Sequence, residues 1–285
     1  MKEKQITLTE ETVLESKPDI RLLAIDLDET MLTAEKTITP RVKAAIRKAR
    51  AQGIVVTIAT GRMYVSALPY AKELDIDVPL ITYQGALIIT TEGQVLAHKT
   101  MSPDLSRELV AFLKPYGHHI NLYMGDDMYI EKDSPEVRRY QEKTRICELR
   151  VIPDFQDFLA GQKEGATKFS LISTPEEVCR IIEEGRARFG DRVQFMPSQP
   201  HFLEFGRPDI GKGLALAEMA ADMGITREQV MAIGDSPNDL DMIEYAGCGV
   251  VMANGLESVR EKADYITADN DHDGVALAIE KLALK

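Results

Sequence analysis

The residues most suited to chemistry are two aspartates that follow an apolar run near the start of the chain. Asp26 and Asp28 stand at the end of the run 20–26, and Thr30 follows them. Residues two apart that leave a strand can face the same crevice, where two carboxylates repel each other unless a cation or a shared proton lies between them. The pattern therefore predicts a positive charge at this place. Asp and Thr also favour turns and helix caps, so these residues alone fit either interpretation.

Two further polar sites combine a cationic side chain with a flexible backbone. Thr60, Gly61 and Arg62 follow the apolar run 54–59 and bring together a hydroxyl, a glycine and a guanidinium. These residues could also simply cap the next helix. Lys212 stands between two glycines at a predicted helix start. An ammonium group and converging backbone amides can bind an anion there, whereas an isolated lysine is usually a solvated surface charge.

The last polar site follows the apolar run 230–234 and contains Asp235, Ser236, Asn238 and Asp239. Ser236 with Asp239 three residues later nearly fits a capping box, which would give Asp239 a local structural role. That interpretation leaves Asp235, at the end of the predicted strand, without an explanation.

A parallel sheet would bring these sites together. Continuous apolar runs are typical of strands that are covered on both faces, and here they alternate with helix patterns. The alternation predicts consecutive right-handed βαβ units, in which ligands bind beyond the carboxyl ends of the strands. The predicted strands of this sheet are 20–26, 54–59, 79–83, 230–234, 248–252 and 264–267.

Helix starts support the same organisation. Thr39 as N-cap and Pro40 in the first turn predict a helix that stops at Gly53. The helix that begins near Lys212 is expected to place Leu214, Ala217 and Ala221 on one apolar face. Further helices are expected over 63–74, from Ser236-Pro237 to about Tyr245, over 255–263 and from about Asp271.

The middle of the chain differs, because short alternating runs outnumber helices there. Ser102-Pro103 and Thr174-Pro175 each predict a helix start, and the runs around them suit antiparallel strands. We therefore predict an α/β fold with a Rossmann-like open parallel sheet, formed by residues 1–85 and 205–285, and an inserted α+β domain over 86–204. Residues 1–18 precede the first strand and are expected to be a tail or an extra edge strand.

Charge and composition exclude several classes of protein. The chain has 285 residues and a formal net charge of −12, which repels phosphate backbones and anionic lipid headgroups, so neither nucleic acid nor a membrane is expected as a partner. The three cysteines, Cys147, Cys179 and Cys248, lack the spacing of a zinc site or a disulfide framework. No apolar run is long enough to cross a membrane and no signal peptide is evident, so we expect a cytoplasmic monomer or homodimer.

Two other motifs fit known ligand sites by spacing alone. Residues 206–212 have the spacing of a nucleotide-binding P-loop, but Gly213 stands where a Ser or Thr would bind Mg²⁺. The segment from Asp269 to Glu280 matches the calcium loop of an EF-hand, but a predicted strand precedes it instead of a helix. We therefore expect this acidic segment to be a turn that caps the last helix.

The four polar sites together resemble the motifs of the haloacid dehalogenase superfamily. Asp26 to Thr30 is similar to its DxDxT element, Thr60 to its hydroxyl at a strand end, Lys212 to its isolated lysine, and Gly234 to Asp239 to its GDxxND element. The motifs occur in order and span nearly the whole chain. The long insertion, the TGR sequence and the approach to the lysine helix resemble the Cof-type subgroup, class IIB, which has a C2 cap.

This resemblance implies a Mg²⁺-dependent phosphatase that forms an aspartyl-phosphate. Asp26 would be the nucleophile, and Asp28 would act as acid and base with a higher proton affinity than Asp26. Asp26, the backbone carbonyl of Asp28 and Asp235 would hold the metal. Substrate binding falls to Thr60, Gly61, Arg62, Lys212 and Asn238, and Asp239 would orient Lys212 or the groups around the metal.

The implied substrate is a small phosphomonoester, such as a sugar phosphate or a phosphorylated cofactor or its precursor. The second aspartate argues against dehalogenation, which needs no acid for an alkoxide leaving group. A phosphomutase of the same fold is one alternative, and a non-catalytic regulator that binds a phosphorylated metabolite is another. Glu29 and Gln84 depart from the small residue and the asparagine that are common in the family, which leaves the loop geometry and one phosphate contact open.

Overall fold

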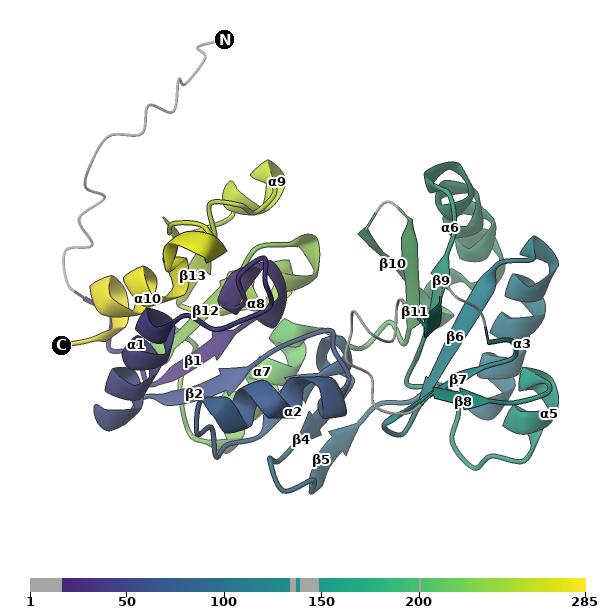
Figure 1. The fold of residues 1–285 in the computed structure, drawn as a ribbon, viewed down its shortest axis with the longest axis horizontal. Coiled ribbons are helices and arrows are strands. Elements are labelled where there is room, and N and C mark those ends of the chain that lie inside the picture. Colours follow the sequence, from purple (N-terminus) through teal and green to yellow (C-terminus); the bar gives the residue numbers. More distant parts are fainter. Residues whose placement is uncertain (1–16, 134–136, 139–148, 200) are drawn as a thin grey trace, which may run out of the picture.

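The computed structural model describes residues 17–133, 137–138, 149–199 and 201–285. Figure 1 shows a core that contains the C-terminus, and beside it the unit formed by the middle of the chain. Among the described residues the strands form three sheets, and the largest in the core has the order β14-β13-β12-β1-β2. Its strands are parallel: β1 (Leu22–Ile25), β2 (Val55–Ile58), β12 (Val230–Gly234), β13 (Cys248–Val251) and β14 (Tyr265–Ile266).

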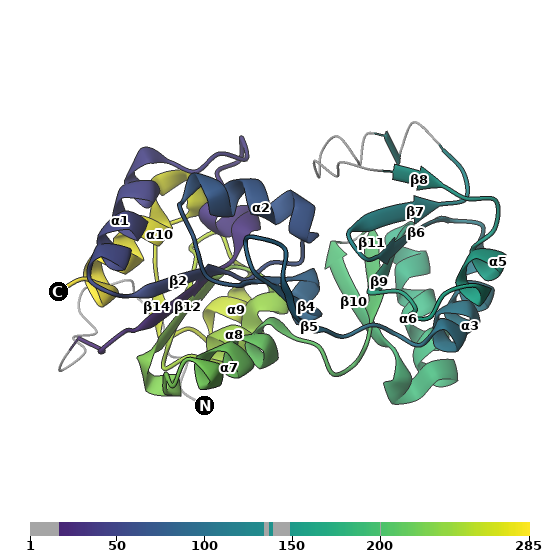
Figure 2. The same cartoon turned by 90° about the horizontal axis from the view of Figure 1, so that it is seen from below.

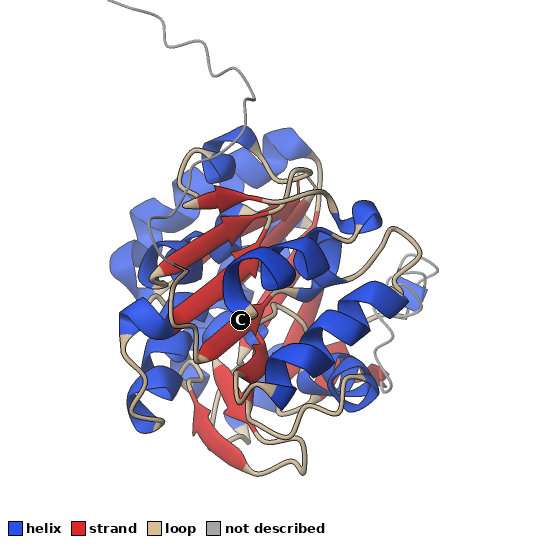
Figure 3. Ribbon diagram, turned by 90° about the vertical axis from the view of Figure 1, so that its left-hand side faces the viewer, coloured by secondary structure: helices blue, strands red, loops and turns tan. Residues whose placement is uncertain are grey.

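Helices cover both faces of this sheet, as Figure 3 shows. The side chains of β1 alternate between the faces, with Leu23 and Ile25 in one apolar cluster and Leu22 and Ala24 in another. One face packs against α1 (Pro40–Ala51), α2 (Tyr64–Glu73) and α10 (Gly274–Ala278). The other face packs against α7 (Lys212–Asp222) and α8 (Leu240–Tyr245). The short helix α9 (Glu257–Arg260) lies between β13 and β14 in the chain. This confirms the predicted α/β architecture, in which every strand of the main sheet must be apolar on both sides.

The ends of α1 follow the predicted signals, but the buried face of α7 does not. The Thr39 side chain accepts a hydrogen bond from the backbone amide of Val42, and Gly53 has a φ of +83° after the helix. In α7 the residues Leu214, Ala217 and Ala221 share one face, but this is not the buried face: Leu214 is 51% exposed, and the buried positions are Ala215, Leu216, Met219 and Ala220. Lys212 is buried on the same side as these residues, so the helix is rotated to point its lysine inwards.

A small antiparallel sheet borders the core. It has the order β3-β4-β5 and consists of β3 (Leu80–Thr82), β4 (Leu87–Ile89) and β5 (Val95–His98). The predicted strand 79–83 is therefore not a full member of the main sheet: a single parallel bridge between Ala59 and Ile81 places β3 next to β2. Residues 87–98, which the sequence suggests to be part of the insertion, therefore pair with a strand that lies against the core. We propose that the inserted domain begins after β5, near Lys99.

The inserted unit has an antiparallel sheet of its own, apart from its parallel β7–β8 pair. Its order is β10-β11-β9-β6-β7-β8, with β6 (His119–Met124), β7 (Asp127–Ile130), β8 (Leu149–Val151), β9 (Lys168–Ile172), β10 (Gln194–Gln199) and β11 (Phe202–Gly206). One face packs against α3 (Pro103–Leu113), α5 (Phe155–Ala160) and α6 (Pro175–Phe189). Ser102 and Thr174 cap α3 and α6 as predicted, whereas the short elements β8 and α5 were not predicted.

The turn between β6 and β7 contacts the start of α2, as Figure 2 helps to follow. Asp126 accepts a hydrogen bond from the backbone amide of Val65 (3.3 Å), and the Tyr83 hydroxyl donates to the carbonyl of Gly125 (3.2 Å). The Met63 side chain, at the N-cap position of α2, makes no capping hydrogen bond within the described chain. The inserted unit therefore supplies the capping carboxylate that this helix lacks.

We expect Asp126→Asn to raise stability at neutral pH and to leave it unchanged near pH 4. Desolvation of the carboxyl group, with the nearby charge of Asp127 adding to it, raises the pKa of Asp126 to about 6. A carboxyl whose folded pKa is raised contributes stability below its unfolded pKa and loses it as pH rises, here between about 4 and 6. Asparagine keeps an oxygen for the Val65 amide but cannot ionise.

The gain is expected to stay below about 1 kcal/mol, because Asp126 is partly exposed and solvent screens its charge. The measurement is the melting temperature of both proteins from pH 4 to pH 8. A difference that is constant over this range would contradict the prediction.

The two chain segments that connect the core with the inserted unit touch each other. The Arg207 guanidinium donates to the carbonyl oxygen of Thr100 (3.0 Å) and forms an ion pair with Asp209 (2.7 Å). Lys99, on the outgoing segment, forms an ion pair with Glu218 of α7 (2.8 Å). The insertion thus leaves and re-enters the core at one place.

In the acidic segment from Asp269 to Glu280, the carboxylates accept hydrogen bonds from other groups of the chain. Asp269 accepts hydrogen bonds from the amides of Asp271 and His272 and so caps the helical turn before α10, while Asp273 accepts one from the Thr39 hydroxyl (2.5 Å). The predicted turn is present, but its side-chain cap belongs to the helical turn 270–272. Asp273, at the N-cap position of α10, makes no side-chain capping hydrogen bond within the part of the chain that the structure describes.

Of the three cysteines, Cys179 is exposed and Cys248 is buried, and neither is in a disulfide. Cys147 lies outside the described residues. The helices of the described ranges are all too short or too polar to cross a membrane.

Candidate active site

The predicted site residues of β1, β2 and β12 meet at the carboxyl edge of the main sheet. Ile25 pairs in register with both Ile58 and Ile233, so the residues that follow these strands emerge at the same level. The backbone amide of Asp26 donates to the carbonyl of Ile233 (3.0 Å), which continues the ladder by one step. Parallel pairing therefore brings Asp26 next to the start of the loop that contains Asp235.

Three carboxylates form the centre of the site. Oxygen atoms of Asp26, Asp235 and Asp239 lie within 4.8 Å of one another. Asp26 is 5% exposed and Asp239 is fully buried. Thr30 is also buried, and its hydroxyl donates to Oδ1 of Asp235 (2.8 Å). The structure thus gives Thr30, the last residue of the first motif, a role in orienting Asp235, which sequence reasoning did not assign to it.

Burial and mutual repulsion disfavour negative charge on two of these groups. Burial raises the pKa of the Asp26 carboxyl well above its usual range, against the attraction of Lys212 and with the repulsion of Asp239 and Asp235. Burial, followed by the charge of Asp239, raises the pKa of Asp235 to about 7. A divalent cation would reverse both effects, because its charge stabilises ionised carboxylates. Clustered carboxylate oxygens are also the donors that Mg²⁺ prefers, so the residues fit the implied metal.

Lys212 links the nucleophile candidate to the third carboxylate. Its ammonium group is fully buried and donates to Oδ1 of Asp26 (2.7 Å) and to Oδ1 of Asp239 (2.6 Å). Burial alone would lower the pKa of Lys212, but the charges of Asp239 and Asp26 outweigh it and raise this pKa. Lys212 therefore keeps its positive charge inside the site.

Asp239 has both of the roles considered from the sequence. Its Oδ2 accepts hydrogen bonds from the backbone amides of Asp235 and Ser236 (both 3.0 Å) and completes a capping box with the Ser236 side chain. Its Oδ1 binds Lys212. With both oxygens engaged, Asp239 is better suited to hold Lys212 than to bind a metal.

Asp28 pairs with Arg62, which overturns the expected order of proton affinities. The guanidinium donates to both carboxylate oxygens, at 2.6 and 2.7 Å. Burial works against ionisation of Asp28, but the hydrogen bonds and charge of Arg62 outweigh it and lower the pKa of this carboxyl. The pKa of Asp26 is raised instead, so the two pKa shifts run opposite to the expected order of proton affinities.

Glu29 stands in a backbone conformation that favours glycine. Its φ is 58°, in the left-handed region, which explains why a small residue suits this position. The Glu29 carboxylate forms an ion pair with Lys36 (2.8 Å), and Lys36 also contacts Asp28 (3.2 Å).

The loop after β2 is packed tightly against Gln84. A Cβ on Gly61 would lie 2.4 Å from Nε2 of Gln84, so a larger residue at position 61 would displace the Gln84 side chain. Oε1 of Gln84 accepts a hydrogen bond from the exposed Asn238 (3.1 Å), which connects this loop to the one after β12. Thr60 is buried, and its hydroxyl accepts a hydrogen bond from the backbone amide of Arg62 (3.2 Å). Gln84 thus connects the two loops that are predicted to bind the substrate. This is the role that the structure shows for Gln84, whose contact with the phosphate was left open by the sequence.

One contact to this loop was missed from the sequence. Lys168, in the first position of β9, donates from Nζ to the carbonyl oxygen of Gly61 (3.2 Å). The only sequence signal was a lysine at the start of an otherwise apolar strand, which is also the usual pattern of a charged strand end.

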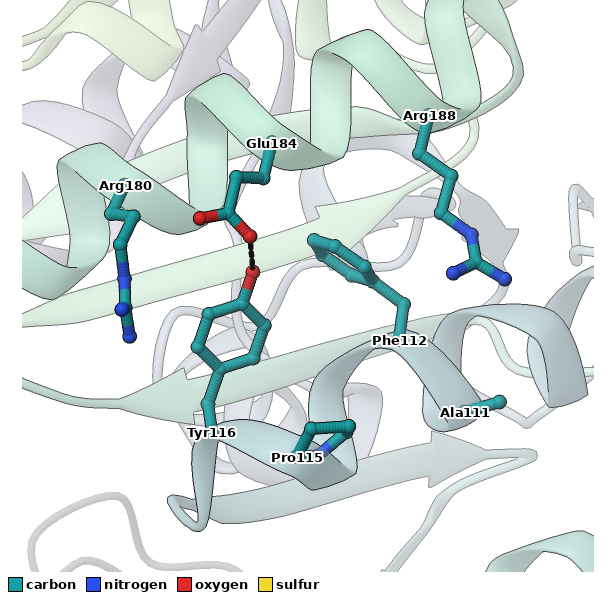
Figure 4. A pocket seen from close by; sticks show the side chains of 7 residues that line it. All are labelled: Ala111, Phe112, Pro115, Tyr116, Arg180, Glu184 and Arg188. Atoms are coloured by element: carbon teal, nitrogen blue, oxygen red, sulfur yellow. Dashed lines mark hydrogen bonds between the residues drawn. The ribbon is translucent and has the colours of Figure 1, made fainter.

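A pocket of about 490 Å³ lies in the inserted unit, between α3 and α6. In Figure 4 the Tyr116 hydroxyl donates to Glu184 (2.5 Å), with Arg180 and Arg188 on either side. None of its lining residues belongs to the motifs or to the acidic cluster. The chemistry therefore points to the strand edge and not to this pocket.

Comparisons with known proteins agree with this site. A family profile described as haloacid dehalogenase-like hydrolase matches residues 23–279. The 5-amino-6-(5-phospho-D-ribitylamino)uracil phosphatase YcsE of Bacillus subtilis is 32% identical, with 93% of this chain and 97% of that protein covered. A solved structure from Thermotoga maritima has a TM-score of 0.83 at 32% identity, covering 93% of this chain and 98% of the other. A haloacid dehalogenase-like hydrolase from Bacteroides thetaiotaomicron also gives 0.83, at 31% identity and with 92% and 99% covered.

Proposed function

The chain belongs to the haloacid dehalogenase-like hydrolases and is a phosphatase of the Cof-type group, and on this premise we propose that it hydrolyses a small phosphomonoester through an aspartyl-phosphate. The observation that carries the proposal is the buried ammonium of Lys212 between Asp26 and Asp239, next to Asp235. A nucleophile, a fixed cation and a cation-attracting carboxylate then share one edge of the sheet.

In the first step, a carboxylate oxygen of Asp26 attacks phosphorus and forms the P–O bond of the aspartyl-phosphate. The bond from phosphorus to the substrate alkoxide breaks, and the Asp28 carboxyl donates its proton to that alkoxide. In the second step, Asp28 takes a proton from water while the water oxygen attacks phosphorus. Asp26 leaves as a carboxylate, and inorganic phosphate is released. Thr60, Gly61, Lys212 and Asn238 hold the phosphoryl oxygens throughout.

We propose that Asp26, the backbone carbonyl of Asp28 and Asp235 hold Mg²⁺. Lys212 contacts Oδ1 of Asp26 and Thr30 contacts Oδ1 of Asp235, and these hydrogen bonds would keep both carboxylates in place for the ion. When bound, the ion supplies positive charge that neutralises the phosphoryl oxygens. Asp239 stays with Lys212 and keeps that lysine directed at the nucleophile.

Asp28 cannot donate a proton while Arg62 holds it in a two-point ion pair. Proton transfer therefore requires the pair to open, and a substrate phosphoryl group is a suitable competitor because a guanidinium binds phosphate with the same geometry as carboxylate. This gives Arg62 the substrate contact that we propose for it: it would exchange Asp28 for the substrate and so raise the proton affinity of Asp28 upon binding.

We propose a sugar phosphate or a phosphorylated cofactor precursor as the substrate. YcsE, by its name, acts on a phosphorylated ribityl compound, which supports this class. The inserted unit would contact the organic part of the substrate and exclude water. A cytoplasmic location and a monomeric or homodimeric state belong to the same proposal.

The test is a screen of phosphorylated metabolites with the purified protein, Mg²⁺ and an assay for released phosphate. We expect release from one chemical class well above that from the others. Interconversion of phosphate isomers without release would identify a phosphomutase instead. Binding without either reaction would identify a regulator.

Removal of divalent metal is expected to stop turnover. Without a cation, burial and the neighbouring carboxylates disfavour the ionised form of Asp26 that attacks phosphorus, and the phosphoryl charge is not neutralised. Treatment with EDTA should lower the rate by about 10³-fold or more, and Mg²⁺ should restore it. Full activity after exhaustive chelation would contradict the assigned metal site.

A further inference from the structure

The inserted sheet places a buried ammonium group against the loop that follows β2. Lys168 is 5% exposed, and its Nζ lies 3.2 Å from the carbonyl oxygen of Gly61 and 2.9 Å from Oε1 of Glu204. The rings of Tyr123 and Tyr83 lie 4.9 and 6.0 Å from the ammonium. Lysine is almost never this buried unless it is paired, so these partners fix its position.

The strand partners of Lys168 make this position rigid. β9 is in the interior of the inserted sheet, hydrogen-bonded to β6 on one side and to β11 on the other. On the same face, the Asn121 side chain donates to the Ser170 hydroxyl (3.0 Å). The backbone of Lys168 is thus fixed by two neighbouring strands, and its ammonium group is fixed by Glu204 of β11. A movement of the inserted sheet would carry the ammonium group with it.

The carbonyl that Lys168 binds belongs to the loop that we propose to hold the phosphoryl group. Gly61 lies between Thr60 and Arg62, whose amide in turn donates to the Thr60 hydroxyl. The Gln84 side chain packs against Gly61 so closely that a Cβ at position 61 would lie 2.4 Å from its Nε2. A rotation of this peptide group would therefore redirect the Thr60 hydroxyl and the Arg62 side chain together.

We propose that Lys168 is a positioning residue that couples the location of the inserted sheet to the Thr60–Arg62 loop. This inference rests on the phosphatase function proposed above. With the sheet docked, the ammonium holds the Gly61 carbonyl and keeps the Thr60 hydroxyl directed at the phosphoryl group. When the sheet moves away, the loop loses this contact and its alignment. The inserted unit thus acts on the chemistry as well as on the organic part of the substrate.

Lys168→Met is the direct test, because it keeps an unbranched, mostly apolar side chain that is one atom shorter and removes the ammonium group. We expect kcat to fall about 10- to 100-fold, with KM changed less than about threefold, because the contact improves alignment in the transition state. The loss should be the same for p-nitrophenyl phosphate as for the best metabolite of the screen. Orthovanadate, which has no organic part, should inhibit the variant about tenfold more weakly.

Lys114→Met is the matched control. Lys114 also pairs with two carboxylates of the inserted unit, Asp154 (2.6 Å) and Glu131 (2.8 Å), but contacts neither the loop nor the core in these pairs. We expect its kcat to equal that of the wild type. If Lys168→Met does not fold, Glu204→Gln weakens the hold on Lys168 and should give a smaller loss of kcat, again equal for both substrates.

The possible results are separable. A raised KM for the metabolite alone would make Lys168 a contact for the organic part of the substrate and overturn the inference. So would an unchanged kcat, with or without a lower melting temperature. Absence of phosphate release by the wild type across the whole screen would instead refute the proposed function.

Discussion

Asp26→Asn is expected to lower turnover by about 10⁴-fold or more while the protein stays folded. An amide has no charged oxygen to attack phosphorus, so the covalent step is lost. Folding should survive because burial already raises the pKa of Asp26 and favours its neutral form, and Lys212 keeps its contact with Asp239. The measurements are the release of phosphate and the urea unfolding curve, with a change in stability of less than about 2 kcal/mol.

Asp19→Asn is the matched control for this variant. Asp19 precedes the same strand at its opposite end and is exposed, with hydrogen bonds to Lys285 and Gln229. Its substitution should leave turnover unchanged. Normal turnover by Asp26→Asn would remove Asp26 as the nucleophile, and a regulator of the kind considered from the sequence would then be the better interpretation.

Lys212→Met is expected to impair both stability and turnover. It leaves Asp26 and Asp239 in a buried site without the cation that both contact, and breaking such a pair from one side costs about 3–5 kcal/mol. Turnover should fall by about 10³-fold, because the phosphoryl group loses a fixed positive charge. Urea unfolding and phosphate release measure the two effects separately.

A second substitution distinguishes these effects. In Lys212→Met with Asp239→Asn, the asparagine oxygen can still accept the amides of Asp235 and Ser236, but no buried carboxylate is left at position 239. We expect this double variant to regain most of the stability and none of the activity. Recovery of activity would show that Lys212 serves only to neutralise Asp239. Lys262→Met, at an exposed lysine, should change neither quantity.

The strands and the acidic centre could be predicted because their signals are local. Strand 230–234 was predicted with the bounds of β12, and the parallel register then forces Asp26 and Asp235 to the same edge. The helix starts at Thr39, Ser102 and Thr174 also depend on a few adjacent residues only. Lys212 could be recognised because its neighbours are glycines at a helix start.

The remaining features depend on contacts between distant segments, which leave no local pattern. The Arg62–Asp28 pair joins two different strand ends and reverses the expected proton affinities. Which face of α7 is buried follows from the pairing of Lys212 with Asp26 at the end of β1, and the apolar spacing within the helix does not reveal it. The start of the insertion stays a prediction: residues 86–98 carry no local signal of the sheet to which they belong, and the pairing of β4 with β3 and of β5 with β4 supports our proposal of a later start.

The contact between Arg207 and Thr100 has a consequence for how this protein can diversify. Because the departing and returning segments are neighbours, a short loop could close the core, and a different module could be joined at the same two points. Recombination or gradual divergence of the inserted unit would change which alcohol is accepted. The core would keep its acidic centre and Lys212, but a new unit would have to supply its own contact to the Gly61 carbonyl. A protein built in this way can change its substrate by exchanging the inserted unit.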